Sequence, residues 1–100
     1  MRVTWRKSAV QSLLELDRWR KTLELLPIAR HLKERIEEYF IKQDFSVHVP
    51  GKPVTIRKMP VDLRIVLLSI GKSEPYKVFY RITGDDVEVF LIRHPRQRPL

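Results

Sequence analysis

The clearest pattern in the sequence is a pair of β-rich runs, 76–83 and 86–93, on either side of Gly84-Asp85. Glycine at the first central position of a two-residue turn is typical of a β-hairpin. The register predicted from this turn pairs Thr83 with Asp86 and continues along both strands. One face is then apolar and is predicted to be core, with Ile82 opposite Val87, Tyr80 opposite Val89 and Val78 opposite Leu91.

The other face of the predicted hairpin mixes cations with aromatic rings. Its pairs are Lys77 with Ile92, Phe79 with Phe90, and Arg81 with Glu88. The last pair has the spacing of a cross-strand ion pair. We therefore interpret this face as the working surface of the protein.

Two helices are predicted upstream of the hairpin. After a short alternating strand at 3–5, Ser8 is placed to cap a helix whose apolar positions cover about half of its circumference. The turn is expected within 22–26, and Pro27 suits the first position of a second helix that reaches Gln43. The two helices are expected to form an antiparallel hairpin that lies on the sheet.

Between the helices and the hairpin lie an irregular segment, 44–60, and an almost continuous apolar run, 63–70. Three prolines and Gly51 punctuate the first segment, whereas the second is typical of a strand buried on both sides. No repeat or linker divides the sequence, so residues 1–100 are predicted to form a single domain. The predicted fold class is α+β: a short N-terminal strand and an α-helical hairpin packed on a small antiparallel β-sheet.

The chain is basic, with a net charge of +8 from 20 Lys and Arg against 12 Asp and Glu. This charge favours a polyanionic partner such as a nucleic acid or an acidic protein. There is no Cys, which excludes disulfides and thiolate chemistry. No apolar run approaches the roughly 20 residues of a membrane span, and no secretory core follows the first residues. A cytoplasmic protein without membrane association is expected.

The residues favour binding of anions over metal or cofactor chemistry. His31, His48 and His94 lack the spacing of metal ligands, and there is no glycine-rich phosphate loop, so neither a metal nor a cofactor is expected. Six cations are predicted to converge on one side of the sheet, with Phe79 and Phe90 between them: Arg64, Lys77, Arg81, Arg93, Arg96 and Arg98.

Such a surface suits the binding of phosphates while an aromatic ring stacks on an exposed base. His94 is a candidate proton donor, because histidine titrates near neutral pH. The alternative is that Phe79 and Phe90 are cross-strand packing and that His94 is an ordinary surface residue. A generic nucleic-acid-binding module is a further hypothesis, for which the affinity would fall steeply with salt.

The order of the elements and the endings 75–82 and 86–98 resemble the RelE/ParE superfamily of bacterial toxins. Its members typically show a Tyr-Arg-hydrophobic-hydrophobic-Tyr strand, an acidic turn, an apolar strand, and a His or Gly followed by basic residues. Ser8-Ala9 followed by Leu13 is similar to the start of the first helix in ParE-type toxins. The resemblance implies the toxin of a type II toxin–antitoxin system, for plasmid or chromosomal stabilisation, that is neutralised by a cognate antitoxin.

The resemblance leaves two targets open. A ParE-like toxin would inhibit DNA gyrase without chemistry, whereas a RelE-like toxin would cut messenger RNA on the ribosome. For the nuclease, the catalytic candidates are Arg64, Lys77, Arg81 and His94. For either target, the binding candidates are Arg64, Lys77, Phe79, Arg81, Phe90, Arg93, Arg96 and Arg98.

Two departures favour the gyrase-directed toxin. Val66 stands where RelE has a second Lys, and Pro99-Leu100 ends the sequence before any late Tyr. Proton-transfer groups of the nuclease are therefore missing. Whether the protein is an enzyme stays open, with the ParE-like toxin preferred and the ribosome-dependent nuclease as the alternative.

Overall fold

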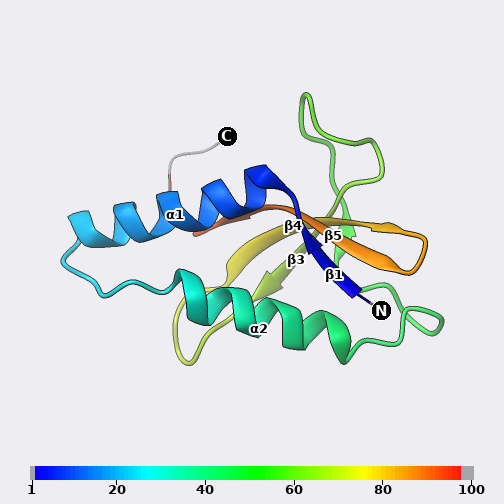
Figure 1. The fold of residues 1–100 in the computed structure, drawn as a ribbon, viewed down its shortest axis with the longest axis horizontal. Helices are drawn as coiled ribbons and strands as arrows, with labels where there is room; N and C mark the ends of the chain where they lie inside the picture. Colours follow the sequence, from blue (N-terminus) through cyan, green and yellow to red (C-terminus); the bar gives the residue numbers. More distant parts are fainter. Residues whose placement is uncertain (1, 98–100) are drawn as a thin grey trace.

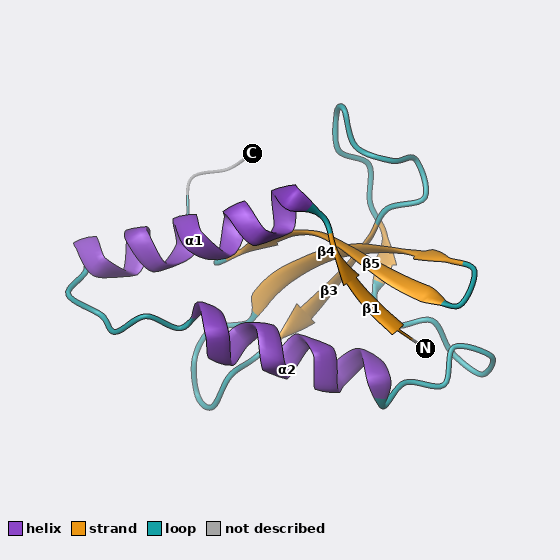
Figure 2. Ribbon diagram, viewed as in Figure 1, coloured by secondary structure: helices purple, strands orange, loops and turns teal. Residues whose placement is uncertain are grey.

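The computed structural model describes residues 2–97. Its elements, in chain order, are β1 (Arg2–Trp5), α1 (Lys7–Thr22), α2 (Ala29–Ile41), β2 (Lys52–Pro53), β3 (Arg64–Leu68), β4 (Tyr76–Thr83) and β5 (Asp86–Arg93). Both helices lie on the same side of a five-stranded sheet with the order β1-β5-β4-β3-β2 (Figures 1 and 2). The predicted α+β class and the helical hairpin on the sheet are confirmed.

The sheet is mixed rather than wholly antiparallel. The β3–β4 and β4–β5 pairs are antiparallel, as predicted, and so is the β2–β3 pair, but β1 runs parallel to β5. A parallel pair needs a long connection between its strands. Here all the intervening elements supply it, so that the first and last strands of the chain lie side by side.

A β-bulge in the β4–β5 hairpin changes the predicted register at the end away from the turn. The pairs from Thr83–Asp86 to Tyr80–Val89 are confirmed, and Gly84 has the positive φ of +60° that its turn requires. Beyond the bulge the pairs are Phe79–Leu91, Val78–Ile92 and Lys77–Arg93, so the predicted pairs at these three positions are wrong. Phe90 is the extra residue, and alternation did not reveal it because apolar side chains follow on both faces.

The main core lies between the helices and one face of the sheet. Its buried side chains include Leu13, Leu16, Leu32, Ile36 and Phe40 from the helices and Val78, Tyr80, Val87, Val89 and Ile92 from the hairpin. The hydroxyl of the buried Ser12 donates to the carbonyl of Ala9 at 2.7 Å and accepts the Ile92 amide at 3.0 Å. This polar contact fixes α1 against β5 without leaving a buried group unpaired.

Both helix starts differ from the prediction. Helix α1 begins at Lys7 without a side-chain cap, and the Ser8 hydroxyl instead donates to the Phe90 carbonyl at 2.7 Å. Helix α2 spans Ala29–Ile41 because the carboxylate of Asp17, on α1, accepts the amides of Ile28 and Ala29 at 2.7 and 3.0 Å. A capping side chain from another helix satisfies the free amides at a helix start in the same way as a capping residue next to them in sequence.

Strand β3 is shorter and less enclosed than its apolar sequence predicts. It ends at Leu68, and Leu67 is 57% exposed, whereas Ile65 on the same face packs beside Phe79, so only the second half of the strand is open on one side. The segment between β2 and β3 extends as a long loop (Figure 1). Within residues 2–97, no helix is both long enough and apolar enough to span a membrane.

Candidate functional site

The face of the sheet away from the helices carries several of the predicted site residues. Lys77, Phe79 and Arg81 alternate with the core residues of β4 and therefore project to this face. Lys77 is exposed and lies between Leu67 on β3 and Arg93 on β5. The start of β4 and the end of β5 thus form a basic end of this face.

Phe79 and Phe90 are not exposed rings, which corrects their assignment to a working surface. They are only 4% and 6% exposed, and they form a second hydrophobic cluster with Leu63. Partly buried apolar side chains from the β2–β3 loop pack against it: Val54, Ile56 and Met59. The loop covers this part of the sheet because three large apolar groups would otherwise face water. Neither ring is available to stack on a base.

Arg81 is held in ion pairs at the turn end of the same face. Its guanidinium lies 2.7 Å from Glu88, which confirms the predicted cross-strand pair, and 3.7 Å from Asp62. It also lies 5.5 Å from the centre of the Phe90 ring. With two acids and a ring beside it, Arg81 serves the packing of the hairpin.

Arg64 lies on the opposite face, so the predicted convergence of all the cations is wrong. It pairs with Tyr80, and residues directly opposite each other share a face. Its guanidinium donates to the carbonyls of Gly51, Pro50 and Val49 at 3.0, 3.4 and 3.5 Å. The Tyr80 hydroxyl donates to the same Pro50 carbonyl, and burial raises the pKa of Tyr80. Arg64 thus anchors the loop that precedes β2.

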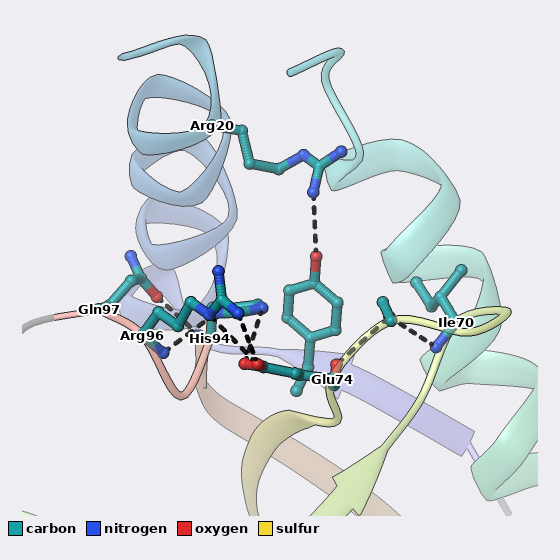
Figure 3. Close-up of polar contacts among 8 residues, drawn as sticks. Arg20, Ile70, Glu74, His94, Arg96 and Gln97 are labelled. Carbon is teal, nitrogen blue, oxygen red and sulfur yellow. Dashed lines mark hydrogen bonds and ion pairs between the residues drawn. The ribbon is translucent and has the colours of Figure 1, made fainter. Parts of the chain in front are cut away.

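His94 lies in an aromatic slot between α1 and the start of β4, not on the open surface. Its ring centre is 5.0 Å from that of Trp19 and 5.2 Å from that of Tyr76. Nδ1 accepts the Arg96 amide at 3.1 Å, and Nε2 lies 3.9 Å from the Glu74 carboxylate (Figure 3). Because Nδ1 is an acceptor, the neutral ring carries its proton on Nε2. Burial lowers the pKa of His94.

The basic C-terminal segment is held against the same slot. The Arg96 guanidinium lies 3.0 Å from Glu74, and the Gln97 side chain accepts the His94 amide at 2.8 Å (Figure 3). Arg98 lies outside the described residues. Arg93, which pairs with Lys77, belongs to the basic end of this face, and Arg96 lies just beyond the end of β5, where it is partly neutralised by Glu74.

The lowered pKa of His94 predicts a loss of stability at acid pH. Because burial disfavours the imidazolium, the unfolded chain takes up the proton first as the pH falls below the ordinary value of 6.5. The free energy of unfolding should therefore be independent of His94 above this pH and fall below it. Urea titrations on both sides of pH 6.5 measure the change.

His94→Asn keeps an acceptor for the Arg96 amide and does not titrate, so this variant should lose that part of the pH dependence. His31→Asn, at an exposed position on α2, is the matched control and should behave as the parent protein. A His94→Asn protein with unchanged pH dependence would contradict the assignment.

The structure also contains a depression near the start of α1 that the sequence did not reveal. It has a volume of about 720 Å³ and lies where β1 meets α1 and the β2–β3 loop, lined by residues that include Trp5, Arg6, Lys7, Lys58, Met59 and Phe90. The adjacent cations Arg6 and Lys7 were visible in the sequence. Lys58 is about fifty residues away, and only the folded loop brings it near them.

Within residues 2–97, no group of three or more His, Cys, Asp or Glu side chains is placed to hold a metal ion. The candidate site consists instead of cations, some in ion pairs and some exposed, on two faces of one sheet.

Comparison with known proteins adds evidence on the fold. No protein-family model and no curated protein sequence matches this chain. A solved structure, described as the chromosomal ParDE TA (toxin–antitoxin) system from P. aeruginosa, matches with a TM-score of 0.65. The match covers 94% of this chain and 95% of that chain at 18% identity. The chain has a ParE-like fold.

The likeness in fold extends over 94% of this chain, which agrees with the fold that the resemblance implied. At 18% identity the likeness concerns the fold. The activity has to be inferred from the residues, since one fold can carry several functions.

Proposed function

We propose that this protein is the toxin of a type II toxin–antitoxin system, in which it binds DNA gyrase and is neutralised by a cognate antitoxin. The observation that carries the proposal is the agreement of the fold, over 94% of the chain, with a chain of a ParDE toxin–antitoxin system. Such a toxin acts by binding, in the cytoplasm, and belongs to a plasmid or chromosomal stabilisation system.

The placement of the cations supports binding rather than RNA cleavage. A nuclease needs its acid, base and phosphate-binding groups around one scissile bond. Arg64 instead holds backbone carbonyls on the helix-covered face, and Arg81 is paired with Glu88. His94 is packed against Trp19. Of the four candidate catalytic groups, only Lys77 is exposed.

The charge of the chain supports an acidic antitoxin. A net charge of +8 attracts an acidic partner over long range and speeds its association. The basic end of the sheet, with Lys77, Arg93 and Arg96, is the proposed contact surface for the target.

Inducible expression in bacteria, with parallel pulse-labelling of DNA and protein synthesis, tests the proposal. We expect DNA synthesis to stop first while translation continues, and the purified protein to inhibit supercoiling by gyrase. Lys77→Ala should weaken this inhibition, whereas Lys72→Ala, in the exposed β3–β4 turn, should not. An early arrest of translation with cleaved messages, abolished by Arg64→Ala and by Lys77→Ala, would identify the ribosome-dependent nuclease instead.

A further inference from the structure

The depression at the start of α1 concentrates positive charge. Lys7 and Lys58 are exposed, and no ion pair with either is found among residues 2–97. Arg6 lies 3.7 Å from Glu88, an acid that it shares with Arg81. Three cations thus line one hollow with a single shared carboxylate beside it.

Lys7 and Lys58 occupy positions that reduce the stability of the free protein. Lys7 is the first residue of α1, which has no acid in its first turn, and a cation near the positive end of a helix is unfavourable. Lys58 has a φ of +67°, a left-handed backbone conformation that is strained for a residue other than glycine. Local conflicts of this kind concentrate at functional sites.

The remaining lining favours a peptide over a nucleic acid. The Phe90 ring already lies near the guanidinium groups of Arg6 and Arg81, each 5.5 Å from its centre. The Trp5 ring has Lys33 at 5.4 Å, and its Nε1 donates to Glu37. Phe90 is only 6% exposed, and Trp5 is partly buried with Lys33 over its ring, so neither ring is an open platform for a base.

The apolar part of the hollow suits a different group. Met59 and Pro60 line the depression beside Lys58, and a thioether adapts to varied apolar side chains. A ligand that combines carboxylates with an apolar side chain satisfies both parts of the lining. A phosphodiester backbone satisfies only the charged part.

We propose that this depression binds an acidic peptide segment of a protein partner. Carboxylates of the segment pair with Lys7 and Lys58, and an apolar side chain between them packs on Met59 and Pro60. The inference rests on the proposed function only in that a toxin has protein partners, and it names the chemistry by which one of them is recognised.

Fluorescence anisotropy with two labelled probes tests the inference on the full chain. The first probe is a short peptide that alternates Glu and Leu, and the second is a single-stranded DNA of equal net charge. We expect the peptide to bind more tightly, with amide chemical-shift changes at Lys7, Lys58 and Met59 in NMR spectra. Lys7→Glu reverses the charge at a contact and should weaken peptide binding roughly tenfold. Lys58→Gly removes a charge and should weaken peptide binding several-fold.

Thermal unfolding of the free variants separates binding from a structural role. Lys7→Glu places an acid in the first turn of α1, and Lys58→Gly relieves the left-handed backbone, so both should raise Tm while they weaken peptide binding. Lys72→Glu is the matched charge control and should leave peptide affinity within twofold, since a distant surface charge acts weakly.

Four results would overturn the inference: no binding of the peptide probe, tighter binding of the DNA probe, an equal loss of peptide affinity in Lys72→Glu, or unchanged peptide affinity in Lys7→Glu. Failure here is distinguishable from failure of the proposed function. Arrest of DNA synthesis by the parent protein is measured without the peptide, so arrest with no peptide binding rejects only the acidic-peptide site.

Discussion

Replacing Gly51 by Ala is expected to destabilise the protein by about 3 kcal/mol or more, because a backbone clash adds to backbone strain. Gly51 has a φ of +78°, and a Cβ added there would lie 2.1 Å from the Ile65 carbonyl oxygen and 2.9 Å from its carbon. These are backbone atoms of β3, so no side-chain rotation relieves the contact. Since small domains are stable by only about 5–15 kcal/mol, the variant should unfold at much lower urea concentration.

Gly71→Ala is the matched control for this experiment. Gly71 also has a positive φ, +58°, but no atom lies within 4 Å of an added Cβ. In the control, the free energy of unfolding should fall only by the cost of the strained backbone, about 1 kcal/mol. Equal losses in the two variants would show that Gly51 does not approach β3 as closely as the structure indicates.

The expected size of the Gly51 effect also reflects what surrounds this residue. The carbonyls of Val49, Pro50 and Gly51 accept the Arg64 guanidinium, and the Pro50 carbonyl accepts the Tyr80 hydroxyl. Displacing Gly51 therefore disturbs a partly buried network whose members depend on one another.

Truncating Phe90 to Ala is expected to cost about 3–5 kcal/mol, the usual range for a buried aromatic side chain. Phe90 is 6% exposed, packs with Leu63 and Phe79, and lies beneath the guanidinium groups of Arg6 and Arg81. Phe90→Leu keeps an apolar side chain in place and should cost less than about 1.5 kcal/mol. Urea unfolding of the two variants measures both changes.

The Phe90 experiment separates packing from base stacking. A ring kept exposed for nucleic acid would contribute little to stability, so Phe90→Ala would then unfold at nearly the same urea concentration as the parent. Leu14→Ala, at a position 53% exposed on α1, serves as the surface control and should change the free energy of unfolding by less than about 1 kcal/mol.

Local patterns predicted the elements of this fold well. The hairpin at Gly84-Asp85, the Arg81–Glu88 pair and the two amphipathic helices depend on residues close in sequence, or on a register that a tight turn sets. Element ends were less accurate, because α2 is capped by Asp17 from α1. A cap from a distant residue leaves no local pattern.

The side chains of the site were placed by contacts far apart in sequence. Phe79 and Phe90, predicted to stack on bases, are buried instead by the bulge and by the β2–β3 loop. Arg64 lies on the other face of the sheet because it pairs with Tyr80. Alternation cannot foresee these outcomes, since several neighbouring positions are apolar on both faces.

The sequence by itself determined the α+β class, the apolar face of the hairpin between its turn and the bulge, and the excess of positive charge. Only the tertiary structure decided which cations lie close together. Lys58 lines the same depression as Arg6 and Lys7, whereas Arg64 and Lys77 lie on opposite faces of the sheet. The physical reason is that local propensity and periodicity act over a few residues, while loops and strand pairing choose the neighbours of a charge.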